Sequence, residues 1–133
     1  MRSLVKHTCA VLVLGWLAVA PASAHHAATV FDRSKPIVVT GVVREFRWTS
    51  PHAWIYLDVP RDTGSPDTAP RDEWAFEGAS ISVMVRNGWR STSLRPGDRV
   101  RVLAAPRKDG SRGGEFLSVT LTESGKVLRL GII

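Results

Sequence analysis

The chain has 133 residues and a formal net charge of +6, and it contains one cysteine, Cys9. A single cysteine excludes a disulfide framework and a set of thiolate metal ligands, so we expect stability to come from an apolar core. The basic side chains stand mostly singly along the chain, which is typical of a solvated surface rather than of a nucleic-acid interface.

The first 24 residues have the pattern of a secretory signal peptide. Arg2 and Lys6 precede an uncharged run over 8–20, and a small-residue Ala-Ser-Ala site follows at 22–24. The run of about 13 residues is short of the roughly 20 that a membrane-spanning helix needs. We therefore predict cleavage after Ala24, export to the periplasm, and no membrane span in the mature protein.

The mature chain predicted from this cleavage carries 16 basic and 12 acidic side chains, a formal net charge of +4. Its length fits one domain with a modest core. Residues 25–36 have no clear period and are expected to form an N-terminal arm, anchored by Val30 and Phe31. Residues 37–133 are expected to form the domain. In the periplasm the available polyanions are lipid headgroups and polysaccharide, so we expect no nucleic-acid partner.

The stretch over 37–59 predicts two strands joined by a tight turn. The first strand runs from Ile37 to Trp48, with a bend or bulge expected at Gly41. The second strand alternates cleanly, and its aliphatic side chains are predicted to face the core. The inward set is Ala53, Ile55, Leu57 and Val59, and the outward set is His52, Trp54, Tyr56 and Asp58.

Residues 60–71 are rich in proline and are expected to form an exposed loop. A short strand follows over 73–77, with Trp74 and Phe76 facing inward. Ser80 can cap a helix that runs to about residue 87, with Gly88 in a left-handed conformation after it. Trp89 is expected to fold back on the core.

Three further strands are predicted over 99–104, 115–121 and 127–130, separated by glycine-containing turns. In the middle one, Leu117, Val119 and Leu121 are expected to lie on one side. Three strands, a helix and two more strands is the order of an OB-type barrel, and closing the sheet removes exposed edges. We therefore predict an all-β fold, a small OB-like barrel of five to six strands with one short helix.

Several motifs resemble those of a family of small exported bacterial proteins described as a domain of unknown function. They are His25-His26, Phe31-Asp32, Gly41-Val42-Val43, the block Trp48-Thr49-Ser50-Pro51-His52-Ala53-Trp54-Ile55, Gly88-Trp89 and Pro96-Gly97-Asp98. The resemblance covers nearly the whole mature chain and implies an exported, barrel-like domain. It implies no activity.

Cleavage after Ala24 would make His25 the first residue, with its α-amine and its ring close enough to chelate one metal ion. Both groups have ordinary pKa values near envelope pH, so a metal can compete with protons for them. A third nitrogen could come from His26 or His52. Three nitrogens suit Cu(II), and zinc is the alternative if a carboxylate or water completes a tetrahedron.

A simpler interpretation of the same histidines stays open. His25 and His26 would then be a polar chain end, and His52 would hydrogen-bond across the turn beside Pro51. Outward-facing Trp54 and Tyr56 indicate a second kind of site, because OB-type barrels bind ligands near their second and third strands. The ligand would be a peptide, a glycan or a partner protein, unless the helix or the arm covers both rings.

No catalytic constellation is present. The carboxylates of Glu45, Asp58, Glu73 and Glu77 are expected to pair across strands with arginines such as Arg44 and Arg47. No serine or threonine lies in a nucleophile motif. We therefore expect a binding module rather than an enzyme, either a copper-binding one or an interaction module of the envelope. Trp48, Trp74 and Trp89 are assigned to the core.

Overall fold

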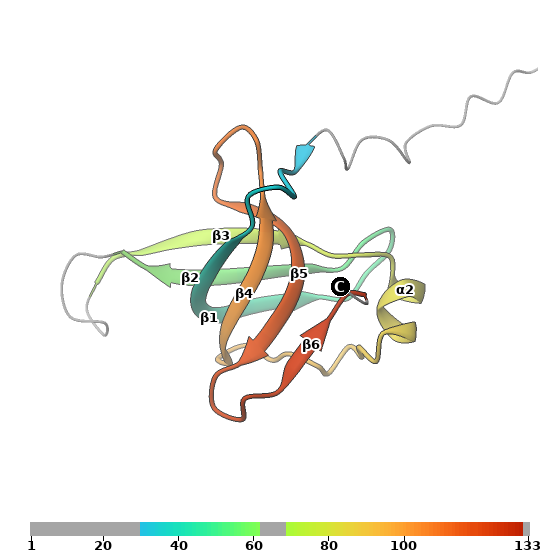
Figure 1. Cartoon of the computed structure of the whole chain (residues 1–133). Coiled ribbons are helices and arrows are strands. Elements are labelled where there is room, and N and C mark those ends of the chain that lie inside the picture. The colour runs from blue at the N-terminus through green and yellow to red at the C-terminus, as the bar shows by residue number, and fades with distance from the viewer. Residues whose placement is uncertain (1–29, 62–68, 132–133) are drawn as a thin grey trace, which may run out of the picture.

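The computed structural model describes residues 30–61 and 69–131 (Figure 1). The elements are β1 (Ile37–Arg47), β2 (Trp54–Pro60), β3 (Arg71–Glu77), α2 (Ile81–Arg86), β4 (Arg99–Pro106), β5 (Gly113–Leu121) and β6 (Val127–Arg129). No helix in these two ranges is long and apolar enough to cross a membrane.

The six strands form one sheet that closes on itself. Its order is β3-β2-β1-β4-β5-β6, and an additional pairing joins β3 to β5. This pairing is parallel and spans Ala75 to Glu77 on β3 and Gly113 to Glu115 on β5, whereas all other strand neighbours are antiparallel. The predicted five-strand OB-like barrel with one short helix between β3 and β4 is therefore confirmed, and β6 extends the sheet beyond it.

The alternation of β2 places its side chains as the sequence predicts. Ala53, Ile55 and Leu57 are fully buried, and Val59 packs against the core while partly buried. Because successive residues of a strand point to opposite faces, Trp54 and Tyr56 are directed outward and are half-buried there.

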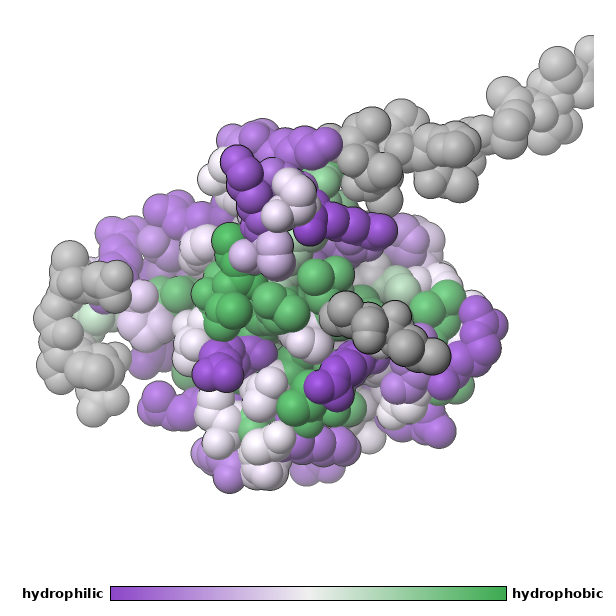
Figure 2. All heavy atoms as spheres, in the orientation of Figure 1, coloured by the Kyte–Doolittle hydropathy of each residue, from purple (hydrophilic) through white to green (hydrophobic). Residues whose placement is uncertain are grey.

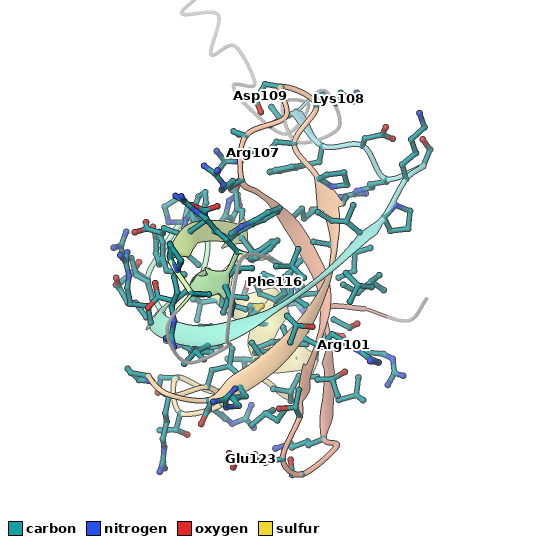
Figure 3. The ribbon with its side chains drawn as sticks, turned by 90° about the vertical axis from the view of Figure 1, so that its left-hand side faces the viewer. Arg101, Arg107, Lys108, Asp109, Phe116 and Glu123 are labelled. Atoms are coloured by element: carbon teal, nitrogen blue, oxygen red, sulfur yellow. The ribbon has the colours of Figure 1, made fainter. Side chains whose placement is uncertain are left out.

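The barrel is filled from β3, α2, β4 and β5. Phe76, Met84 and Phe116 have no exposed surface, and Figure 3 shows Phe116 in the interior and Arg101 directed away from it. Trp89 is fully buried as predicted, and its indole Nε1 donates a hydrogen bond to the carbonyl oxygen of Arg129 at 2.8 Å. Trp48 and Trp74 are only partly buried and pack against the same core.

The helix ends as predicted but begins without a side-chain cap. Gly88 has φ of 84°, a left-handed conformation that favours glycine after a helix. Ser80 occupies the N-cap position, but its hydroxyl lies 3.2 Å from the hydroxyl of Ser82 and makes no capping hydrogen bond.

Two of the predicted strand details are wrong, and both involve a bulge. The register of β1 against β2 shifts between Val43 and Glu45, so the extra residue is Arg44 and not Gly41. Gly41 instead lets β2 approach closely, since a Cβ there would lie 2.8 Å from the carbonyl oxygen of Asp58. On β5 the register shifts at Leu117, and Phe116 rather than Leu117 faces the core with Val119.

The described part of the N-terminal arm lies along the end of β4. Phe31 pairs with Arg107, the Val30 carbonyl accepts from the Lys108 amide at 2.9 Å, and the Asp32 amide donates to the Pro106 carbonyl at 2.8 Å. Phe31 is buried, which confirms it as an anchor, whereas Val30 is 45% exposed and is not one. Residues 1–29, including the predicted signal peptide and its cleavage site, lie outside the described residues.

Candidate functional site

The outward side of β1, β2 and β3 carries most of the polar and aromatic residues singled out in the sequence. We call it the aromatic face and define it by Arg44, Glu45, Arg47, His52, Trp54, Tyr56, Asp58, Glu73 and Glu77. The register places Arg47 beside Trp54 and Trp54 beside Glu77 in one row across the three strands. Glu45, Tyr56 and Ala75 form the next row. Because Ala75 has a small side chain, β3 places little bulk beside the Tyr56 ring.

Trp54 and Tyr56 form a stacked pair on this face. Their ring centroids are 6.3 Å apart and their planes meet at 21°. The guanidinium of Arg47 lies over the Tyr56 ring at 4.7 Å from its centroid, and that of Arg44 at 5.9 Å. Such cation–π contacts hold the tyrosine ring in one orientation.

Both arginines are also held by carboxylates. Arg47 donates from Nε to Glu45 at 2.9 Å and from Nη1 to the Tyr56 hydroxyl at 2.9 Å. The hydrogen bond that Arg47 donates to Glu45 raises the pKa of Arg47 above its ordinary value, against a smaller opposing effect of burial. Arg44 forms an ion pair with Glu73 on β3, reaching there from the bulge of β1. The expected pairing across strands is therefore confirmed for Glu73 with Arg44, whereas Glu45 pairs with Arg47 along the same strand.

His52 lies in the turn that precedes β2, at the end of the aromatic face. Its Nδ1 is 2.5 Å from Oε1 of Glu77, and the imidazole side chain is 44% exposed. An ionised carboxylate can only accept, so Nδ1 carries the hydrogen of this bond. In the neutral ring, Nε2 then keeps its lone pair, and that nitrogen is available to a metal ion.

The structure brings His52, Trp54 and Tyr56 together on one surface, but it does not place His25 and His26, which lie outside the described residues. The arm that leads to them leaves the barrel at the turn after β4. The pairing of Phe31 with Arg107 and the ion pair of Arg33 with Glu115 hold the described part of the arm against this turn and the start of β5.

Charge and ligand counts limit what the aromatic face can bind. Four carboxylates and two guanidiniums give it a net negative charge when His52 is neutral, which favours cationic ligands over anionic ones. Within 30–61 and 69–131 no group of three or more His, Cys, Asp or Glu side chains could hold a metal ion. A metal bound through His52 would need ligands from elsewhere.

The sequence reasoning found the aromatic pair and His52 but not their supports. Glu77 was expected to pair with an arginine, and instead it orients His52. No sequence pattern gives the register of β2 against β3 that brings Glu77 beside Trp54 and His52. The described partners of Trp54 and Tyr56 are each other and the guanidiniums of Arg44 and Arg47.

The fold is thus an OB-like barrel with an aromatic pair on β2 and an oriented histidine in the turn before it. The chain belongs to the family described as "Family of unknown function (DUF6152)", whose model matches residues 14–116. No curated protein matches the chain, and no solved structure matches it.

Proposed function

We propose that the chain is a small exported binding module of the periplasm that binds Cu(II) through its processed N-terminus. The terminal amine and the ring of His25 would supply two nitrogens, with His26 or His52 as the third. The proposal depends on cleavage after Ala24, which the small residues at 22–24 favour.

The observation that supports this proposal best is the contact between His52 and Glu77. Metal-ligating histidines almost always donate their other ring nitrogen to a carboxylate or carbonyl group, which fixes the ring and its tautomer. His52 has this arrangement at 2.5 Å, with its ring partly exposed.

The two candidates for the third nitrogen, His26 and His52, differ in how far the N-terminal arm must reach. Five residue steps separate Val30 from His25, and a fully extended chain covers at most about 17 Å over five steps. The amine, His25 and His26 are consecutive and need no docking, whereas His52 becomes a ligand only if the arm reaches the end of the aromatic face.

The test uses protein exported and processed by a bacterial host and titrated with Cu(II) against a competing chelator. We expect one tight site per chain. A form with one additional residue before His25 should lose affinity by orders of magnitude, because the terminal amine is displaced. Equal weak binding by the two forms would remove the copper proposal.

Two further variants locate the third nitrogen. If His52 is a ligand, His52→Gln weakens binding strongly and Glu77→Gln weakens it by about 10- to 100-fold, as loss of a supporting carboxylate does in other metal sites. If His26 is the ligand, both variants bind as the parent does and His26→Gln loses affinity. Arg95→Gln, in the turn before β4, is the matched surface control.

The second candidate function is an interaction module that holds a peptide, a glycan or a partner protein on the aromatic face. The observation in its favour is that Trp54 and Tyr56 lie stacked and partly exposed on the strand that OB-type barrels use for binding. The net negative charge of the face favours a partner with basic groups.

A double change of Trp54→Ala and Tyr56→Ala tests this candidate. It should abolish retention of a basic peptide ligand while the unfolding transition stays cooperative. Val38→Ala is the control, because Val38 is 58% exposed on the outward side of β1 beside β4. Loss of folding in the double variant would assign both rings to packing instead.

A further inference from the structure

A hollow of about 310 Å³ opens where β5 leaves β3, on a different part of the surface from the aromatic face. Its walls are made by Ala79, Leu117, Leu130 and Gly131 and its rim by Arg33 and Glu115, and Phe116 lies beneath them with no exposed surface of its own. Figure 2 shows hydrophobic residues gathered over the middle of β4 and β5, with hydrophilic residues around them.

The hollow follows from the way the barrel closes. The parallel pairing of β3 with β5 ends at Glu77 and Glu115. Beyond Glu115, β5 bulges at Leu117 and pairs with β6 from Ser118 onward. The two strands therefore diverge above Phe116, and a bulge at such a place re-aims the side chain of the extra residue.

Phe116 beneath the hollow and Leu130 in its wall are both held in place by neighbouring residues. The Phe116 ring lies 5.4 Å from the ring of Trp89, and a Cβ on Gly78 would lie 2.6 Å from it. Leu130 is held by a hydrogen bond from its amide to the carbonyl oxygen of Leu117 at 3.0 Å. The apolar lining is thus preformed, as in most small-molecule sites.

The rim carries an ion pair between Arg33 and Glu115 that leaves one nitrogen of the Arg33 guanidinium unused. Arg33 donates from Nε and Nη2 to the two oxygens of Glu115 at 2.9 and 2.8 Å. Its Nη1 takes no part in this pair and can donate to a second acceptor. The Arg33 side chain is 63% exposed and that of Glu115 only 18%, so a ligand at the rim meets the cation first.

We propose that this hollow binds a small amphipathic anion, a medium-chain aliphatic carboxylate. The chain lies on Ala79, Leu117 and Leu130, and the carboxylate accepts hydrogen bonds from Arg33. The volume corresponds to about ten water molecules at roughly 30 Å³ each, which limits the ligand to about ten non-hydrogen atoms. The proposal uses none of the residues of the copper site or of the aromatic face.

The experiment compares octanoate, octanol and octylamine by ¹H–¹⁵N chemical-shift titration of the full chain. Octanoate should bind about tenfold more tightly than octanol, because a charge-assisted hydrogen bond contributes that much. Octylamine should bind more weakly than octanol. The shifted amides should include those of Leu117 and Leu130. Arg33→Gln should bring octanoate to the level of octanol and leave octanol unchanged, whereas Arg95→Gln should alter neither.

Three results would overturn the proposal. They are equal binding of octanoate and octanol, octanoate affinity unchanged in Arg33→Gln, and shifts confined to residues away from the hollow. An additional variant replaces both Ile132 and Ile133 by serine. If octanoate binds this form and not the parent, the chain's own end is the occupant and the proposal fails. A failed copper titration leaves all of these outcomes unaffected.

Discussion

Replacement of Gly114 by alanine tests the closure of the barrel, on which the aromatic face and the hollow both depend. Gly114 pairs with Phe76 on β3 and with Pro106 on β4. An alanine Cβ there would lie 2.1 Å from the carbonyl oxygen of Ala105, and real Cβ contacts essentially never fall below 3.0 Å. β4 and β5 must therefore separate by about 1 Å, a shift that costs on the order of 1–3 kcal/mol as overpacking does.

The separation also weakens strand hydrogen bonds on both sides of β5, each contributing about 1 kcal/mol. We expect Gly114→Ala to lower the free energy of unfolding by about 3 kcal/mol, a large part of the total of a small domain. The measurement is urea denaturation followed by tryptophan fluorescence. Gly131→Ala is the matched control, since nothing lies within 4 Å of its Cβ position, and it should change stability by less than about 0.5 kcal/mol. If Gly114→Ala unfolds at the same urea concentration as the parent, the close approach of β4 and β5 is wrong.

Trp89→Phe should lower the free energy of unfolding by about 1–3 kcal/mol, because the part-buried carbonyl of Arg129 loses the indole donor of the fully buried Trp89; an unchanged denaturation midpoint would contradict the hydrogen bond. Hydrogen bonding from Arg61 lowers the pKa of Asp72, an effect that Arg112 adds to and burial opposes. The folded pKa lies below the unfolded value, so the stabilisation is present above the unfolded pKa and is lost as the pH falls through the folded pKa. Asp72→Asn should therefore be less stable than the parent at neutral pH, with the difference shrinking as the pH falls toward 3; a difference that stays constant with pH would refute the ion pair's role.

The inward face of β2 was predictable because the barrel interior excludes water. Under that constraint, every second residue must be apolar, and Ala53, Ile55 and Leu57 follow the rule without a break. The strand order followed in the same way, since a chain this short has few ways to bury the sheet's edges.

The bulges were not predictable, because one extra residue reverses the alternation beyond it. On an uninterrupted β5, Leu117 would face the core together with Val119, because alternate residues of a strand share a face. Phe116 is the buried residue instead. On β1 the same shift brings Arg44 outward, where it pairs with Glu73. The sequence marks Gly41 as the irregular position, but Gly41 instead allows β2 to lie close to β1.

The support of His52 could not be predicted either, because it depends on register across a loop. Glu77 lies 25 residues from His52 along the chain, and the pairing of Trp54 with Glu77 brings the two together. The connection over 60–71 has no turn type that fixes this register from sequence alone. The sequence marks Phe31 as an anchor of the arm, but it does not indicate the backbone pairing of Phe31 with Arg107 that sets the arm's position.

Native mass spectrometry of the protein recovered from the periplasm of a bacterial host after growth with copper tests the central proposal most directly. A single measurement gives the first residue of the chain and the mass of any ion it carries. The proposal predicts a chain that begins at His25 and holds one copper ion. A chain that begins at another residue, or one that begins at His25 and carries no copper, would contradict it.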